Sequence, residues 1–383
     1  MGIRFGLKQL IKMYIQSVHL PAVYRRACRR TTVDSRRIIM ADMHSDGLPF
    51  SMQAVYVELI RRGYRPLLMC KDTGKMSYRE SLHFMEEFMK AYAGAGLVFI
   101  STYFLPVSSA KKRKETKVIQ LWHSGGLLKK MGYDTTDDIP KFYKGNVTAN
   151  YDLVTVSAPI CEKVWEKALH LPAGTAKAVG LARTDNYFDK DWNDKSRNLF
   201  EEEYPEAKGK KIILYAPSFS GNAANPFCAG LELLAKKGGL RPDFFGEEYY
   251  LVVRPHPNLR KKYPQYFEKR ERRVSSTYIL SVADYLITDY SSILFDYAIY
   301  KRPFVLFCPD IDRYEKNRGF YVDINEFPCP VTKTVGELKA VFDGTSELRG
   351  FGSKEELENF YQKYMGACDG RSLERIMDYV TNS

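Results

Sequence analysis

Two histidines directly follow short apolar runs, and residues that favour an anion accompany each of them. His123 comes after Gln120-Leu121-Trp122 and is followed by two glycines and by two lysines, of which Lys129 is the first. Glycines allow close backbone approach and lysines supply positive charge, so a phosphate fits beside this histidine. An imidazole at a strand end can also take a proton near neutral pH. These neighbours favour a catalytic histidine over a structural one.

The second histidine, His256, lies between two prolines at the end of another apolar run. Its segment reads Val252-Val253-Arg254-Pro255-His256-Pro257. The prolines restrict the backbone, which holds the imidazole in one place. A rigid turn with an exposed histidine is the alternative, but Arg254 and His256 together favour the binding of an anion.

A third stretch, residues 281–307, predicts a strand, a turn, a helix and a second strand. Asp289 ends the first apolar run, Ser291 or Ser292 can accept from the free N–H groups that open a helix, and Asp296 follows one turn later. N–H groups, hydroxyls and the positive helix end then meet at one point, where an anion fits. An ordinary βαβ unit with a serine cap is the alternative.

Other signals are weaker or absent. Ser218 lies at a further strand end, where a binding role and a structural role are equally compatible with the sequence. The chain contains neither a GxxxxGKS/T loop nor a GxGxxG turn, which argues against an ATPase and a nicotinamide enzyme. No carboxylates of the DxD kind stand out as a metal site, and there is no CxxC pair. We therefore expect no metal and no cofactor, with the protein's own cations neutralising the substrate.

The charge of the chain indicates an anionic partner. The 58 Lys and Arg outnumber the 46 Asp and Glu, which gives a net charge of +12. Nucleic acid is disfavoured because basic and aromatic residues do not alternate as in single-strand binding grooves. The seven scattered cysteines favour a reducing cytosol. No apolar run approaches the roughly 20 residues that span a bilayer, so a soluble or peripheral protein is expected.

The first 31 residues carry Lys and Arg but no acidic residue, with apolar residues at helical spacing from Phe5 to Val18. This pattern predicts a basic amphipathic helix that lies in the headgroup layer of an anionic membrane. A helix packed on the protein, with a solvated basic face, is the alternative.

Short apolar runs alternate with helical stretches along the rest of the chain. Strands are predicted at 38–41, 66–70, 96–100, 118–121, 153–156, 212–215, 250–253, 285–287 and 304–307, and helices at 51–62, 78–93 and 355–379. This alternation predicts an α/β fold with doubly wound parallel sheets. A charged break over 189–211, which we interpret as a linker, divides the pattern into two halves. We predict two Rossmann-like domains with a cleft between them, bounded as 1–31 for the helix, 32–205 and 206–383.

Three motifs in this order resemble the CDP-glycerol glycerophosphotransferase family, which builds the poly(polyol phosphate) chains of teichoic acids and some capsules. They are Gln-Leu-Trp-His at His123, Arg-Pro-His-Pro at His256 and Thr-Asp-Tyr-Ser-Ser-Ile-Leu-Phe-Asp over 288–296. Arg318-Gly319-Phe320-Tyr321, followed by Asp323, is also typical of the family. Many members have Gly-Thr-Pro after the first histidine where Ser124-Gly125-Gly126 stands here, which blurs the identity of the polyol.

The resemblance implies a GT-B-like fold, with the acceptor-side domain first and the nucleotide-side domain second. It implies that His123 is the general base and that His256 lies near the donor pyrophosphate. Asp289, Ser291 and Ser292 fall in the motif that holds the nucleotide diphosphate. The implied reaction transfers glycerol phosphate, or alternatively ribitol phosphate, from CDP-glycerol or CDP-ribitol to an acceptor hydroxyl, and CMP leaves.

The expected acceptor is an undecaprenyl-diphosphate-linked saccharide or a polyol-phosphate polymer, at the cytoplasmic face of the cell membrane. The length of the chain favours a primase or a compact polymerase. Two other classes stay open at this point. One is a GT-B glycosyltransferase with a nucleotide-sugar donor, and the other is a non-catalytic protein that binds phosphate or a membrane.

Overall fold

The computed structural model describes residues 10–139, 141, 143–221, 226–267 and 274–382, and it divides into two compact units. Unit 1 comprises 1–123, 139–183 and 371–383, and unit 2 comprises 124–138 and 184–370. The predicted boundaries near 31 and 205 divide the chain differently. Sequence pattern shows where an element begins, but which core it joins depends on packing, and the chain changes units four times.

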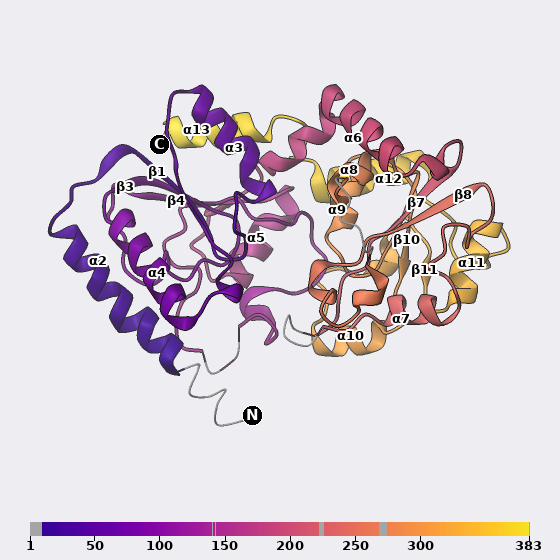
Figure 1. The fold of residues 1–383 in the computed structure, drawn as a ribbon, viewed down its shortest axis with the longest axis horizontal. Helices are drawn as coiled ribbons and strands as arrows, with labels where there is room; N and C mark the ends of the chain where they lie inside the picture. Colours follow the sequence, from indigo (N-terminus) through magenta and orange to yellow (C-terminus); the bar gives the residue numbers. More distant parts are fainter. Residues whose placement is uncertain (1–9, 140, 142, 222–225, 268–273, 383) are drawn as a thin grey trace. The chain divides into compact units, whose positions relative to one another are not determined.

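Unit 1 is built on a six-stranded parallel sheet with the order β2-β1-β3-β4-β5-β6 (Figure 1). Its strands are β1 (Asp34–Asp42), β2 (Leu67–Cys70), β3 (Ala95–Ile100), β4 (Lys117–Gln120), β5 (Leu153–Thr155) and β6 (Ala176–Lys177). Every residue of β3 is buried, as expected for an apolar strand that is covered on both faces of a parallel sheet.

The helices of unit 1 are η1 (Ile15–His19), α2 (Leu20–Cys28), α3 (Phe50–Arg61), α4 (Tyr78–Tyr92), α5 (Pro159–Ala168) and α13 (Ser372–Asn382). Helix α4 begins with a capping box, in which Ser77 and Glu80 satisfy each other's backbone N–H groups. Its apolar positions recur at helical spacing, so one face is buried against the core. Ile376 and Met377 of α13 belong to the same core as Met52 of α3, which places the C-terminal helix in unit 1.

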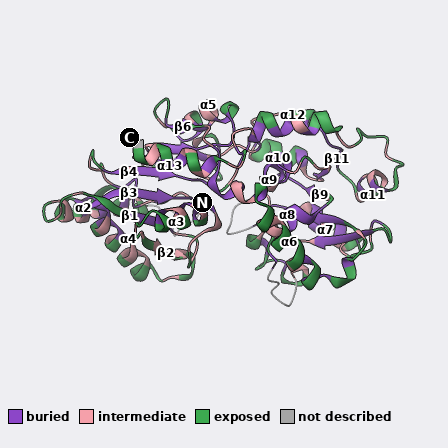
Figure 2. Cartoon of the chain, turned by 90° about the horizontal axis from the view of Figure 1, so that it is seen from above, coloured by how far each residue is buried: buried purple, intermediate pink, exposed green. Residues whose placement is uncertain are grey.

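Unit 2 is built on a five-stranded parallel sheet with the order β11-β10-β9-β7-β8. Its strands are β7 (Lys211–Tyr215), β8 (Tyr249–Val253), β9 (Tyr285–Thr288), β10 (Phe304–Phe307) and β11 (Val331–Thr332). Its helices are α6 (Lys190–Glu203), α7 (Ala229–Lys236), α8 (Ser276–Val282), α9 (Ile293–Ala298), α10 (Ile311–Asn317), α11 (Val335–Asp343) and α12 (Lys354–Met365). In both units the central strands are mostly buried, whereas the first four residues of β1 and the first two of β2 are exposed (Figure 2).

Short 3₁₀ helices complete the two units. They are η2 (Thr73–Lys75), η3 (Gly132–Asp134), η4 (Ala182–Phe188), η5 (Pro205–Ala207), η6 (Pro257–Leu259), η7 (Pro264–Tyr266) and η8 (Ile324–Glu326). Several of them follow strand ends or open on proline, whose fixed φ suits a first helical position.

The α/β fold with parallel sheets is confirmed, and all nine predicted strands are present. Strands β6 and β11 were not predicted, because two residues are too few for a recognisable pattern. The predicted helix over 355–379 is two helices, α12 and α13, which belong to different units. The cleft expected from the sequence stays a prediction.

The charged break over 189–211 was wrongly interpreted as a linker, because most of it is helix α6. Asp189 caps this helix by accepting from the N–H groups of Asp191 and Trp192. Only Ser196, Phe200 and Glu203 are buried along it, at helical spacing. A helix with so narrow a buried face has a polar composition that resembles a linker.

Within the predicted N-terminal helix, residues 1–9 lie outside the described part. Residues 10–28 are helical and bury Gln16, Leu20 and Tyr24, whereas 29–31 are not helical. Leu10, Ile11, Tyr14 and Val18 are exposed. Among the helices that the structure describes, none is long and apolar enough to cross a membrane.

Candidate active site

His123 lies at the carboxyl edge of the unit 1 sheet, three residues after the end of β4. Trp122 precedes it with φ of 52°, in the left-handed region that non-glycine residues seldom adopt. The Gln120 side chain accepts the Trp122 N–H at 3.1 Å, and the rings of Tyr103 and Trp165 pack edge-on against the indole. This turn buries Trp122 and leaves His123 exposed. Strained backbone held by its surroundings is characteristic of functional sites.

The hydrogen bonding of His123 assigns its tautomer. Its Nδ1 lies 3.0 Å from the carbonyl oxygen of Ser101. A carbonyl can only accept, so Nδ1 carries the hydrogen and the lone pair of the neutral ring is on Nε2. The ring also stacks on Trp122 with 5.3 Å between centroids. An exposed imidazole with its lone pair on Nε2 can act as a general base.

In unit 2, the ends of β7, β8 and β9 are tied together by hydrogen bonds. The Ser218 N–H donates to Asp289 Oδ1 at 2.7 Å, which joins the loops after β7 and β9. The His256 N–H donates to the Pro217 carbonyl at 3.1 Å, which joins the loops after β8 and β7. Three predicted residues, Ser218, His256 and Asp289, therefore lie at one edge of this sheet. Parallel α/β sheets bind ligands at this edge.

His256 has the opposite arrangement to His123. Its Nδ1 accepts from the Asn258 N–H at 3.2 Å, so in the neutral ring the hydrogen is on Nε2. The half-buried ring packs edge-on against Phe219, with 4.9 Å between centroids. An Nε2–H group held in this way can donate a hydrogen bond to a phosphate oxygen.

Asp289 is buried, and its neighbours shift its pKa in opposite directions. Burial raises the pKa of Asp289 to about 6, and the Asp310 carboxylate adds to that effect. The Ser218 N–H and the charge of Lys129 act in the opposite direction. Near neutral pH the carboxylate is ionised and accepts from the Ser218 backbone, so Asp289 organises the loop after β7.

Lys129 supplies the positive charge of this region. Burial, with a smaller contribution from the nearby Arg318 guanidinium, lowers the pKa of Lys129 to about 8. Asp289 and Asp138 counteract both effects. The ammonium is thus charged at neutral pH but poorly solvated, and a ligand phosphate would relieve that desolvation.

The segment that carries Lys129 is held by the Arg318-Gly319-Phe320-Tyr321 motif. Lys129 forms a β-bridge with Phe320, and the Lys130 N–H donates to the Gly319 carbonyl at 3.0 Å. Arg318 donates to the Lys130 carbonyl at 3.0 Å and to the Asp138 carboxylate at 2.8 Å. The family resemblance included this motif without giving it a role. The structure shows that it fixes the segment following His123 in unit 2.

Two positions in and around the Lys129 segment require glycine for steric reasons. Gly126 has φ of 65°, and a Cβ atom there would lie 2.3 Å from the ring of Phe295. Gly319 has φ of 77°, and its missing side chain leaves room for the Lys130 chain. Both positions require the left-handed region, where glycine carries no steric cost.

The helix that follows Asp289 is short. Ser291 Oγ accepts from the Ile293 N–H at 3.4 Å, whereas Ser292, the N-cap residue of α9, makes no side-chain capping bond. Asp296 is buried and lies 3.5 Å from the hydroxyl of Tyr187, which donates to it. The ligand-binding roles of Ser291, Ser292 and Asp296 stay predictions.

The Arg254 guanidinium hydrogen-bonds to the hydroxyl of Tyr204, and its Cζ lies 5.6 Å from the centre of that ring. Its main-chain N–H donates to the Tyr215 carbonyl at 2.8 Å, so the residue also belongs to the edge formed by β7 and β8. Its predicted role as an anion ligand stays a prediction.

Sequence reasoning missed Asp310, which follows β10. Its carboxylate accepts from the Tyr290 hydroxyl at 3.0 Å and from the Ser220 hydroxyl at 2.9 Å. The Tyr290 ring in turn stacks on Tyr314, with 3.7 Å between centroids. Asp310 braces the loops after β7 and β9. Its position near a strand end was a signal, but a lone carboxylate there does not distinguish a brace from a ligand.

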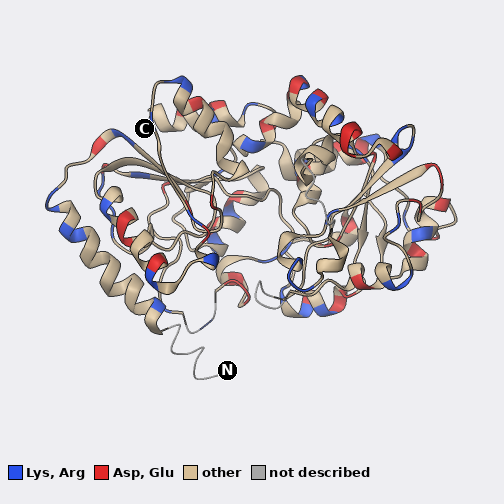
Figure 3. Ribbon diagram, in the orientation of Figure 1, with Lys and Arg blue, Asp and Glu red and all other residues tan. Residues whose placement is uncertain are grey.

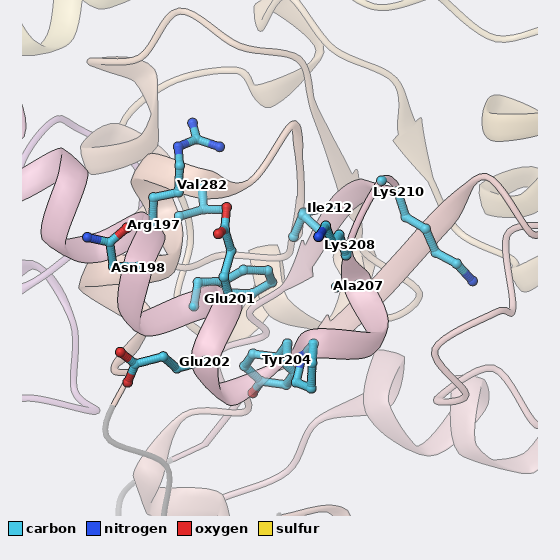
Figure 4. Close-up of a pocket in the computed structure, with 13 residues that line it drawn as sticks. Arg197, Asn198, Glu201, Glu202, Tyr204, Ala207, Lys208, Lys210, Ile212 and Val282 are labelled. Carbon is cyan, nitrogen blue, oxygen red and sulfur yellow. The ribbon is translucent and has the colours of Figure 1, made fainter.

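A hollow of about 640 Å³ lies elsewhere in unit 2, at the amino end of β7 (Figure 4). Its lining mixes cations such as Arg197, Lys208 and Lys210 with Glu201 and Glu202 on the same surface. It contains none of the predicted site residues. Among the described residues, no group of three or more His, Cys, Asp or Glu could hold a metal ion.

Comparison with known proteins bears on these residues. The profile of the CDP-Glycerol:Poly(glycerophosphate) glycerophosphotransferase family matches residues 22–382. The teichoic acid ribitol-phosphate primase of Bacillus spizizenii is 30% identical over 367 residues, which cover 91% of this chain and 92% of that protein. The teichoic acid glycerol-phosphate primase of Bacillus subtilis is 28% identical over 304 residues, which cover 75% of this chain and 73% of that protein.

The fold is similar to that of the wall teichoic acid polymerase TagF. A variant of TagF soaked with CDPG superimposes with a TM-score of 0.70 at 20% identity, covering 99% of this chain and 97% of that one. At this identity the likeness supports the fold, which is the two-sheet α/β architecture described above.

Proposed function

Since this chain belongs to the CDP-Glycerol:Poly(glycerophosphate) glycerophosphotransferase family, we propose that it transfers a polyol phosphate from a CDP-polyol to an acceptor hydroxyl. The observation that carries the proposal is the extent of the family match, because residues 22–382 include every predicted site residue. Members of this family are enzymes, so the non-catalytic alternative is set aside. The reaction belongs to teichoic acid synthesis, as in the two primases.

In this proposal His123 is the general base. Its Nε2 takes the proton from the acceptor hydroxyl, while the Ser101 carbonyl keeps Nδ1–H in place. The acceptor oxygen attacks the phosphorus that bears the polyol. The bond from that phosphorus to the bridging oxygen breaks, and the electron pair leaves with CMP. No covalent enzyme intermediate is needed.

His256 and Lys129 are proposed to bind the diphosphate of the donor. Because Nδ1 of His256 already accepts a hydrogen bond, its Nε2–H is the group that donates to a phosphoryl oxygen. Lys129 adds a charge that is poorly solvated in the free protein. Fixed donors and charges of this kind supply most of the stabilisation of a phosphoryl transition state.

We propose ribitol phosphate as the preferred transferred group, with glycerol phosphate as the alternative. The ribitol-phosphate primase is matched over 92% of its length, and the glycerol-phosphate primase over 73%. Glycerol phosphate, which the motifs alone favoured, remains the second arm of the test.

We propose a lipid-linked acceptor and a peripheral position at the cytoplasmic face of the membrane. The exposed side chains of Leu10, Ile11, Tyr14 and Val18 support this, and basic residues follow them along α2 (Figure 3). Apolar side chains beside cations suit the headgroup layer of an anionic bilayer. We expect the protein to sediment with anionic vesicles but not with neutral ones. If it sediments with neither kind of vesicle, the proposed membrane position is overturned.

The deciding experiment measures nucleotide release from CDP-ribitol, CDP-glycerol and UDP-sugars side by side, with an undecaprenyl-diphosphate-linked saccharide as acceptor. CMP release from one CDP-polyol, with growth of the acceptor by polyol phosphate on product sizing, is the expected result. Release of UDP from a UDP-sugar instead would identify a glycosyltransferase. No release from any donor would overturn the proposed function.

A further inference from the structure

A second exposed imidazole, that of His44, lies at the same sheet edge as His123. His44 follows the end of β1 by two residues, and β1 and β4 are the two neighbours of β3 in the sheet. Both rings are held by consecutive residues just after β3. His123 Nδ1 lies 3.0 Å from the Ser101 carbonyl, and His44 Nδ1 lies 3.2 Å from Thr102 Oγ1. Because consecutive Cα atoms are about 3.8 Å apart, one short stretch anchors both imidazoles.

A buried carboxylate assigns the tautomer of His44. Asp42, the last residue of β1, is 1% exposed. Its Oδ2 accepts the Thr102 hydroxyl at 2.9 Å, and its Oδ1 accepts the His44 backbone N–H at 2.7 Å. The hydroxyl hydrogen is thus used towards Asp42, so Thr102 Oγ1 accepts from His44 Nδ1–H. The lone pair of the neutral His44 ring is then on Nε2, as in His123.

The loop that carries His44 is fixed to its surroundings. Thr73 donates to the Met43 carbonyl through both its N–H, at 3.0 Å, and its hydroxyl, at 3.1 Å. Lys75 forms an ion pair with Asp46 at 3.0 Å on the other side of His44. An exposed side chain on a braced loop is preorganised for a ligand rather than for a structural contact.

Hydrogen bonds also connect the two histidines through the sheet edge. The Gln120 side chain donates to the Thr102 carbonyl at 2.8 Å and accepts the Trp122 N–H at 3.1 Å. The residue that holds His44 is therefore linked to the strained turn that presents His123.

We propose that His44 binds a second hydroxyl of the acceptor, next to the hydroxyl that His123 deprotonates. This inference rests on the proposed function. Polyol and sugar acceptors carry hydroxyls on neighbouring carbons, and two lone pairs presented from one sheet edge match two such hydroxyls. His123 serves the attacking oxygen, and His44 holds the neighbouring one and thereby selects acceptors with adjacent hydroxyls.

The first test replaces His44 by alanine and by glutamine and measures both Michaelis constants. For His44→Ala we expect the acceptor KM to rise roughly tenfold, the loss of one hydrogen bond, while the donor KM is unchanged. His44→Gln, whose amide oxygen can accept, should recover part of that loss. His83→Ala is the matched control, because His83 is an exposed histidine of α4 in the same unit. An unchanged acceptor KM in His44→Ala would overturn the inference.

The second test removes the partner hydroxyl from the acceptor instead. The wild-type enzyme should lose about the same factor with a deoxy acceptor that lacks the neighbouring hydroxyl, and His44→Ala should lose nothing more. If the deoxy acceptor weakens the wild-type enzyme and His44→Ala by the same factor, His44 does not contact that hydroxyl. Thr102→Val should mimic His44→Ala in part, and Thr102→Ser should not.

The two levels of the proposal fail differently. If the wild-type protein releases no CMP from any CDP-polyol, the proposed function is overturned and this inference falls with it. If CMP is released and the acceptor KM does not respond to His44, only the inference about His44 is overturned.

Discussion

His123 and His256 each lie at the carboxyl edge of a parallel sheet, yet their rings are held in opposite ways. The Nδ1 of His123 donates to a main-chain carbonyl, and the Nδ1 of His256 accepts from a main-chain N–H. One neutral ring therefore presents a lone pair on Nε2, and the other presents a hydrogen. Two histidines at equivalent sheet edges thus present different groups, one a hydrogen-bond acceptor and the other a donor.

This difference teaches that the hydrogen-bond partner of Nδ1 decides which group each imidazole presents on Nε2. A strained turn and a carbonyl leave the lone pair of His123 on Nε2, as the proposed base requires, and a proline-bounded turn leaves a hydrogen on Nε2 of His256, as the proposed phosphate donor requires. At the unit 2 sheet edge, the charge of Lys129 acts on Asp289, which is bonded to the loop after β7.

The largest effect is expected for His123. Replacement by alanine removes the base and should lower kcat by roughly 10²–10⁴, with the donor KM nearly unchanged. His123→Gln should be equally impaired, because an amide takes no proton. Steady-state CMP release measures both. Near-normal turnover of either variant, compared with His83→Ala, would remove the assignment.

A smaller effect with a different pattern is expected for His256. Removing a hydrogen-bond donor to a phosphoryl oxygen should cost roughly 10²–10³ in kcat/KM. Here glutamine should recover activity, because its amide N–H can replace Nε2–H. If His256→Gln is as inactive as His256→Ala while His123→Gln is active, the two roles are exchanged.

Lys129 should make donor binding depend on pH. Its pKa is lowered to about 8 by burial, so it loses its charge as the pH rises above that value. The donor KM should then rise about tenfold per pH unit, because the charged fraction falls by that factor. Lys129→Arg should abolish this rise, since a guanidinium stays charged. Lys130→Met is the matched control, and a wild-type KM that is flat from pH 7 to 9.5 would contradict the role of Lys129.

Arg318 tests whether the segment after His123 must be held. In Arg318→Ala the contacts to the Lys130 carbonyl and to Asp138 are lost, and Lys129 loses its anchorage. We expect the donor KM to rise roughly tenfold, as a modest displacement of a binding group would cause. Arg318→Lys should recover part of the lost donor affinity. A loss confined to kcat would instead point to the His123 side of the comparison.

The smallest effect concerns stability and involves no substrate. Burial raises the pKa of Asp289 to about 6, so the folded state holds this proton more tightly than the unfolded chain does. Stability should therefore fall as the pH rises from about 4 to 6, and Asp289→Asn should flatten that fall. Urea unfolding at pH 4.5 and 6.5 measures it. Asp312→Asn, at a side chain that is 92% exposed, is the control and should not change the slope.

Much of the fold and the chemistry was determined by the sequence alone. Strands such as β3 and β9 are short apolar runs whose period and length allow few alternatives, and the types of His123, Lys129 and His256 indicated phosphate chemistry. These are local properties, and local pattern is what a sequence displays directly.

Packing between distant segments set which residues share a core and which atoms face each histidine. Helix α6 read as a linker because just three of its positions are buried, and α13 joins unit 1 through contacts far away in the chain. The tautomers of His123 and His44 depend on Ser101 and Thr102, in the loop that follows a different strand, β3. Such partners are set by register and packing between distant segments, which no local pattern contains.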